Sequence, residues 1–125
     1  MFEIKVKGEF DAAHRVAGYP GKCDRLHGHS WTVELSVTGQ QLDELGMLVD
    51  FKRVRGALME VLDTMDHQYL NELPPFKEVN PTAENLARYI YQVLAKQPIF
   101  GAQAHLQAVC VLESPHSSVT YSEGV

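Results

Sequence analysis

The sequence predicts an α+β domain in which four antiparallel strands and two helices follow one another in the order strand, strand, helix, helix, strand, strand. Residues 2–14 and 27–39 alternate apolar and polar side chains, as strands with one buried face do. Residues 51–64, and the segment that begins at Asn80, repeat apolar side chains at three- and four-residue steps, as amphipathic helices do. This order favours one sheet that both helices cover on the same face.

Turn and capping residues set the limits of these elements. Residues 15–26 contain glycine and proline and form a loop, so the first two strands pair as a long antiparallel hairpin. Asp50 and Thr82 are suited to be the N-caps of the two helices. The last two strands are expected over 104–113 and 117–122, with a tight turn between them.

Length and composition indicate one globular domain, residues 1–125. The chain is 45% hydrophobic and 22% charged, which is too apolar for a disordered protein. Its net charge of −5 argues against a general nucleic-acid binder, and no apolar run is long enough to span a membrane. The N-terminus has no signal-peptide pattern, and Cys23 and Cys110 do not make a disulfide framework. We therefore expect a reduced, cytoplasmic protein.

Three histidines are predicted to meet at one end of the hairpin. His27 and His29 are two residues apart in a strand, so they point to the same, core-facing side. His14 ends the first strand in phase with its apolar face, and antiparallel pairing brings it close to both. One structural and one solvated histidine would explain the pair alone, but not the third imidazole. Three imidazoles with a free fourth position are typical of a catalytic zinc site.

Three further positions carry reactive groups in unusual surroundings. Cys23 lies in a polar loop where no apolar neighbour accounts for it. Asp66 and His67 follow the first helix, and they are either a helix terminus or an acid–imidazole pair for proton transfer. Glu113 ends the third strand, where its carboxylate is either solvated or an anchor for a ligand.

The predicted architecture leaves sheet edges that another copy of the chain would cover. Long edge strands present unpaired backbone groups and invite pairing with a second chain. A symmetric oligomer whose sheets join edge to edge would close these edges, and it would place sites at subunit boundaries.

The motifs and their order resemble those of the 6-pyruvoyltetrahydropterin synthase family, over essentially the whole chain. The resemblance is closest to its bacterial branch, the 6-carboxytetrahydropterin synthases of the queuosine and 7-deazaguanine pathway. The matching residues are Phe10-Asp-Ala-Ala-His14-Arg15, Cys23-x-x-x-His27-Gly28-His29, Asp66-His67, Asn80-Pro-Thr-Ala-Glu84-Asn85 and Glu113.

The resemblance implies a T-fold, a ββααββ unit whose copies assemble into a barrel, usually as a hexamer of two trimers. It also implies a residue set for each task. Zinc would be held by His14, His27 and His29; the catalytic proton-transfer residues would be Cys23, Asp66 and His67; the pterin would be anchored by Glu113, with Thr82 and Glu84 near its pocket.

The substrate implied by the resemblance is 7,8-dihydroneopterin triphosphate. The bacterial branch converts it to 6-carboxy-5,6,7,8-tetrahydropterin, acetaldehyde and triphosphate. Arg15, Lys22 and Arg25 are candidates for binding the triphosphate, because a compact polyanion needs positive charge and hydrogen-bond donors. The alternatives are a 6-pyruvoyltetrahydropterin synthase, a non-catalytic pterin- or metal-binding oligomer of the same fold, and a structural zinc module.

Overall fold

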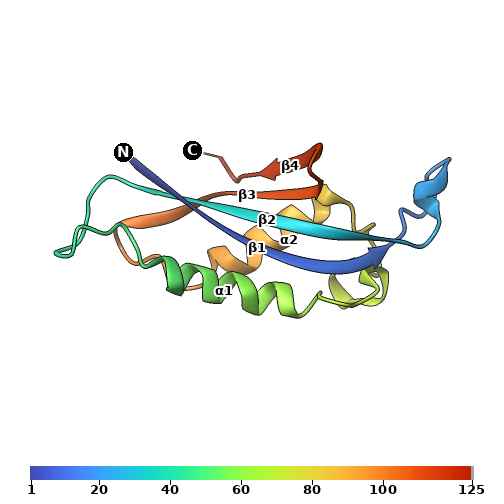
Figure 1. Cartoon of the computed structure of the whole chain (residues 1–125), viewed down its shortest axis with the longest axis horizontal. Helices are drawn as coiled ribbons and strands as arrows, with labels where there is room; N and C mark the ends of the chain where they lie inside the picture. The colour runs from blue at the N-terminus through green and yellow to red at the C-terminus, as the bar shows by residue number, and fades with distance from the viewer. Residues whose placement is uncertain (125) are drawn as a thin grey trace.

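A computed structural model of the chain describes residues 1–124 and shows a four-stranded sheet with two α-helices (Figure 1). The sheet is antiparallel in the order β1-β2-β3-β4, so β1 and β4 are its edges. The predicted α+β order is confirmed, and each strand lies within one residue of its predicted bounds. The elements are β1 (Phe2–His14), β2 (His27–Gly39), α1 (Phe51–Asp63), α2 (Ala83–Ala95), β3 (Ala104–Ser114) and β4 (Ser117–Tyr121).

Both helices lie on the same side of the sheet, where the apolar face of each strand meets them (Figure 1). The central strand β2 contributes four inward side chains that are completely buried, namely Trp31, Val33, Leu35 and Val37. Removing each such side chain from water stabilises the fold by about 1.5–3 kcal/mol. The opposite face is polar, and there Lys5 and Lys7 each lie 3.6 Å from the carboxylate of Glu34. Within residues 1–124, no helix combines the length and apolar character needed to cross a bilayer.

Side-chain caps fix the starts of both helices, as predicted. The Asp50 carboxylate accepts a 2.9 Å hydrogen bond from the backbone N–H of Lys52 at the start of α1. The Thr82 hydroxyl accepts a 3.1 Å bond from the backbone N–H of Asn85 at the start of α2. These caps satisfy helix N–H groups that have no partner within the helix. The cap at Thr82 also fixes the position of the preceding Pro81, which contacts the site described below.

Gly8 allows α1 to pack closely on β1, and a larger residue there is expected to be destabilising. A Cβ atom at Gly8 would lie 2.9 Å from Leu62 Cδ1 and 3.0 Å from Met59 Sδ. Because overpacking a core typically costs 1–3 kcal/mol, we expect Gly8→Ala to lower the free energy of unfolding by about 1–2 kcal/mol. Urea denaturation followed by circular dichroism measures this change.

Gly56→Ala provides the matched control within the same pair of elements. Gly56 is exposed in the middle of α1, and a Cβ atom there would meet nothing within 4 Å. Alanine is a better helix former than glycine by about 1 kcal/mol, so this variant should be more stable than the wild type. If Gly8→Ala proved as stable as Gly56→Ala, the close packing of α1 on β1 would be wrong.

Candidate functional site

The three predicted histidines meet at the end of the β1–β2 hairpin. His14 and His27 lie opposite each other in the strand register, and His29 follows on the same face of β2. The ring centroid of His14 is 4.5 Å from that of His27 and 5.2 Å from that of His29, and the latter two are 4.9 Å apart. One ring nitrogen from each residue lies within 4.8 Å of the other two. We call these residues the histidine triad.

The hydrogen bonds of His14 and His27 leave the Nε2 atoms of both rings free to bind a metal ion. His14 Nδ1 lies 2.7 Å from the carbonyl oxygen of Pro81, and His27 Nδ1 lies 2.7 Å from that of Arg25. A carbonyl only accepts, so both Nδ1 atoms carry the proton and each neutral ring has a free lone pair on Nε2. The Nε2 atoms of His14 and His29 are buried and have no hydrogen-bond partner among residues 1–124.

These orphaned nitrogens fit a bound metal ion. Buried polar atoms normally have partners, and metal-binding imidazoles usually donate their other N–H to a carbonyl or carboxylate. Burial lowers the pKa of His14, with His27 and His29 lowering it further against the opposing effect of the Pro81 hydrogen bond. Burial also lowers the pKa of His29. Burial therefore favours the neutral, metal-binding form of His14 and His29, and a set of three imidazoles suits zinc or a similar transition-metal ion.

Glu113, at the end of β3, lies beside the triad and is only partly exposed to solvent. Its Oε1 atom lies 3.6 Å from His29 Nε2, and its side chain is 36% exposed. Its negative charge acts to raise the pKa of both His14 and His29, opposing burial. The carboxylate thus lies beside the triad and is accessible to a ligand. Its role as the pterin anchor stays a prediction.

Asp66 and His67 form an acid–imidazole pair just beyond the end of α1. His67 Nδ1 lies 2.9 Å from Asp66 Oδ2, and this contact raises the pKa of His67 above its ordinary value. The pKa of Asp66 is lowered, first by the backbone N–H of Asp11 and then by His67. His67 has a φ of 58°, a left-handed conformation that is uncommon for a residue other than glycine and that concentrates at functional sites. We call these two residues the Asp–His pair.

The sequence did not reveal what holds this pair in place. The segment after α1 runs along the free edge of β1, where Ala13 forms a parallel bridge to Tyr69 and donates a 3.1 Å hydrogen bond to Gln68. The backbone of Asp11 contacts both members of the pair, and its side chain accepts a hydrogen bond from Ser30. Asp11 and Ser30 are ordinary polar-face residues in the strand pattern, and the only signal for Asp11 was its place in the motif that ends at His14 and Arg15.

One cleft is lined by a residue of the triad and by a residue of the Asp–His pair. It has a volume of about 570 Å³ and lies over the ends of β1 and β2. Clefts of about 300–1,000 Å³ accommodate small organic molecules. His29 of the triad and His67 of the pair both line it. The full lining is Asp11, Ala12, Ala13, Gly28, His29, Ser30, His67, Gln68 and Tyr69.

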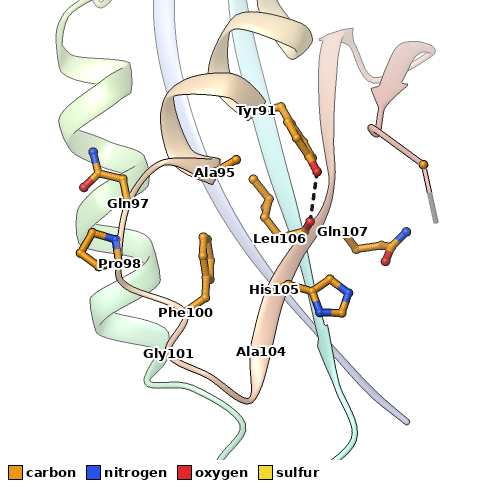
Figure 2. A pocket seen from close by; sticks show the side chains of 11 residues that line it. Tyr91, Ala95, Gln97, Pro98, Phe100, Gly101, Ala104, His105, Leu106 and Gln107 are labelled. Atoms are coloured by element: carbon orange, nitrogen blue, oxygen red, sulfur yellow. Dashed lines mark hydrogen bonds between the residues drawn. The ribbon is translucent and has the colours of Figure 1, made fainter.

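A second pocket, of about 490 Å³, lies between the C-terminal end of α2 and the start of β3 (Figure 2). Figure 2 shows Tyr91 pointing to the backbone of Leu106, to which its hydroxyl donates a 3.4 Å hydrogen bond. His105 lines this pocket, and its Nε2 atom lies 2.9 Å from the Thr38 hydroxyl. Neither the triad nor the Asp–His pair lines it, so we do not take it for the active site.

Cys23 lies in a well-anchored loop that projects beyond the end of the hairpin (Figure 1). Its carbonyl accepts a 2.7 Å hydrogen bond from the backbone N–H of Val16. Arg15 binds the next residue twice, with Nη2 2.6 Å from Asp24 Oδ1 and Nε 3.0 Å from the Asp24 carbonyl oxygen. The Cys23 side chain is exposed, and within residues 1–124 it belongs to neither cluster of potential ligands. The structure therefore does not bring Cys23 to the Asp–His pair of its own chain.

Two asparagines that sequence reasoning missed hold the start of this loop. The side-chain amide of Asn71 bonds both backbone groups of Arg15, at 2.9 and 3.0 Å. The amide of Asn80 does the same for Ala17, at 3.0 and 3.1 Å. Each side-chain amide thus makes the two hydrogen bonds that the backbone of a neighbouring strand would otherwise make. The position of Asn80 in the motif before α2 was the available signal, whereas nothing marked Asn71.

The structure places the remaining predicted substrate-binding residues without testing them. Thr82 caps α2 and Glu84 is exposed in its first turn, and neither lines the 570 Å³ cleft. Arg15 is already paired with Asp24, whereas Lys22 and Arg25 are exposed beside Cys23. Their contacts with a pterin or a triphosphate stay predictions.

Comparisons with known proteins identify the family and the fold. A family model described as 6-pyruvoyl tetrahydropterin synthase matches residues 3–124. The chain is 33% identical to the 6-carboxy-5,6,7,8-tetrahydropterin synthase of Synechocystis sp., over 97% of this chain and 93% of that protein. It is 32% identical to the 6-pyruvoyl tetrahydrobiopterin synthase of Dictyostelium discoideum, over 81% and 73%. The structure of Caenorhabditis elegans 6-pyruvoyl tetrahydropterin synthase superposes with a TM-score of 0.85 at 27% identity, covering 98% and 96% of the two chains.

Proposed function

The chain belongs to the 6-pyruvoyl tetrahydropterin synthase family, and on that premise we propose that it is a 6-carboxy-5,6,7,8-tetrahydropterin synthase. This lyase would convert 7,8-dihydroneopterin triphosphate to 6-carboxy-5,6,7,8-tetrahydropterin, acetaldehyde and triphosphate, within queuosine and 7-deazaguanine biosynthesis. The observation that carries the proposal is the cleft lined by both His29 and His67, because one small molecule bound there would reach a proposed metal ligand and a proposed proton-transfer group.

The metal in this proposal is Zn²⁺, held by His14, His27 and His29. When bound, it would act as a Lewis acid that stabilises negative charge on substrate oxygen. The two unpartnered Nε2 atoms and the carbonyl-bonded Nδ1 atoms of the triad support this assignment. Glu113 beside the triad would accept two N–H bonds from the 2-amino-4-oxo edge of the pterin, a paired recognition that suits a carboxylate.

Proton transfer in this proposal belongs to His67 and Cys23. Asp66 holds His67 Nδ1, which leaves Nε2 of His67 to take a proton from the substrate or return it. Cys23 would exchange a proton on the other side of the substrate. Arg15, Lys22 and Arg25 are the proposed contacts for the triphosphate.

We propose that the active enzyme is a homo-oligomer, a hexamer of two trimers in which sheets join edge to edge. Two features support assembly: β1 is a long edge strand, and the projecting Cys23 loop is outside the clusters of its own chain. Edge pairing would bring the Cys23 loop of one subunit to the cleft of another and complete the site at the boundary. Cys23 and Cys110 are both free thiols, which is consistent with the cytoplasmic location that we propose.

Incubation of the zinc-loaded protein with 7,8-dihydroneopterin triphosphate tests this function. We expect a pterin product with the mass of 6-carboxy-5,6,7,8-tetrahydropterin, together with one acetaldehyde per turnover. Mass spectrometry and a coupled acetaldehyde assay measure both. A 6-pyruvoyl product without acetaldehyde would instead establish the second candidate, 6-pyruvoyltetrahydropterin synthase, which the Dictyostelium relative favours. Binding without turnover would indicate a non-catalytic pterin-binding oligomer.

A further inference from the structure

Asp11 on β1 is connected to both members of the Asp–His pair through its backbone. Its N–H donates a 2.9 Å hydrogen bond to Asp66 Oδ1, and its carbonyl accepts a 2.6 Å bond from the backbone N–H of His67. Any residue except proline could make these two backbone contacts, so they do not explain why an aspartate is present there.

The side chain of Asp11 adds a second carboxylate beside His67. One oxygen of Asp11, one oxygen of Asp66 and one ring nitrogen of His67 all lie within 4.8 Å of one another. Ser30, opposite Asp11 on β2, donates a 2.6 Å hydrogen bond from its hydroxyl to Asp11 Oδ1. Two carboxylates this close repel each other unless a positive charge lies nearby, and a protonated His67 supplies that charge.

We propose that the Asp11 carboxylate, held by Ser30, is a positioning residue that acts with Asp66 to orient His67 and to stabilise its protonated form. The inference rests on the proposed function, in which His67 exchanges a proton with the substrate. The other titratable groups that line the same cleft are His29 on β2 and Tyr69 on the segment of His67 itself. The charge of Asp11 acts in the same direction as Asp66, which is the larger cause of the raised pKa of His67.

The variant Asp11→Asn tests this role, with Glu9→Gln as its control. Asparagine keeps both backbone hydrogen bonds and removes only the charge. Glu9→Gln removes a charge of the same sign from the same face of β1, two residues away. The pKa of His67 is measured by NMR titration of its imidazole protons in the metal-loaded protein without substrate, with the signal assigned by its absence in His67→Asn.

We expect Asp11→Asn to lower the pKa of His67 and Glu9→Gln to leave it nearly unchanged. The difference between the wild type and Asp11→Asn should shrink at 1 M salt, where the Debye length is only about 3 Å. Ser30→Ala, which frees the Asp11 side chain, should shift the pKa in the same direction by less. Ser30→Ala also provides the test if the Asp11→Asn protein does not fold. An unchanged pKa in both Asp11→Asn and Ser30→Ala would overturn the proposal.

Turnover provides a second readout. Asp11→Asn should lower kcat by about tenfold, a part of the roughly 10²–10⁴-fold that general acid–base catalysis contributes, and should leave KM close to that of the wild type. Equal loss of kcat in Glu9→Gln would assign the effect to overall charge and contradict the proposal. If the wild type had no turnover at all, the proposed function would fail, while the NMR titration would still decide whether Asp11 acts on His67.

Discussion

Replacing His29 with alanine is expected to remove the bound metal ion and to reduce turnover by at least about 10²-fold, since Lewis-acid catalysis supplies several kcal/mol of transition-state stabilisation. His29 supplies one of the three imidazoles of the triad, and its Nε2 atom is buried without a hydrogen-bond partner among residues 1–124. Elemental analysis of the purified variant measures the metal content, and the acetaldehyde assay measures turnover.

His105→Ala is the matched control for this variant. His105 lies near the start of β3, lines the second pocket and contacts Thr38, so its loss should leave metal content and turnover unchanged. Treatment of the wild type with a chelator should abolish activity and preserve most of the β-sheet signal in circular dichroism. A His29→Ala protein that still bound one metal ion per subunit would contradict the assignment of the triad, and unfolding by the chelator would favour a structural zinc module.

The second large effect is expected for Cys23→Ala, which should lower kcat by about 10²–10⁴-fold while metal and pterin binding persist. The Cys23 side chain is exposed, and only its backbone carbonyl takes part in the contacts that anchor the loop. The substitution therefore removes the thiol without disturbing the triad or the Asp–His pair. Steady-state kinetics, metal analysis and calorimetric titration of a pterin product measure the three properties.

Cys110→Ala separates the role of this thiol from a general effect of cysteine loss. Cys110 lies on β3 opposite Glu34 and Thr120 on the neighbouring strands, away from the hairpin end. We expect Cys110→Ala to keep the turnover of the wild type. Cys23→Ala protein with undiminished kcat would exclude a proton-transfer role for the thiol, although it would leave the family assignment unaffected.

The sheet and the triad could be predicted because both depend on the two-residue period with which side chains alternate along a strand. Alternation along residues 2–14 and 27–39 fixes which side chains face the helices, and antiparallel pairing through the loop of residues 15–26 fixes which strand ends meet. His14, His27 and His29 therefore had to share one face and one end. The caps at Asp50 and Thr82 were predictable for a similar reason, since each depends on contacts within three residues.

The supports of the site could not be predicted, because they depend on contacts between distant segments. No local pattern indicates that residues 66–69 follow the free edge of β1, or that Asn71 and Asn80 bond the backbone after His14. The same limit applies to Cys23. Its spacing from His27 placed the thiol in the loop beside the triad, but no local pattern indicates where the thiol lies relative to the Asp–His pair. In the proposed oligomer, that relation would depend on how the subunits pair.

The hydrogen bond from His14 Nδ1 to the Pro81 carbonyl links the metal site to the start of α2. Three segments must therefore be in register before the triad is complete: the end of β1, the start of β2, and the turn that Thr82 caps. Binding energy that a metal ion gains from this arrangement is available only to the folded chain, so by mass action the ion stabilises the docking of α2 on the sheet. If the triad binds the proposed ion, metal affinity is also a measure of tertiary assembly, and we expect variants that loosen the α2 N-terminus to weaken metal binding.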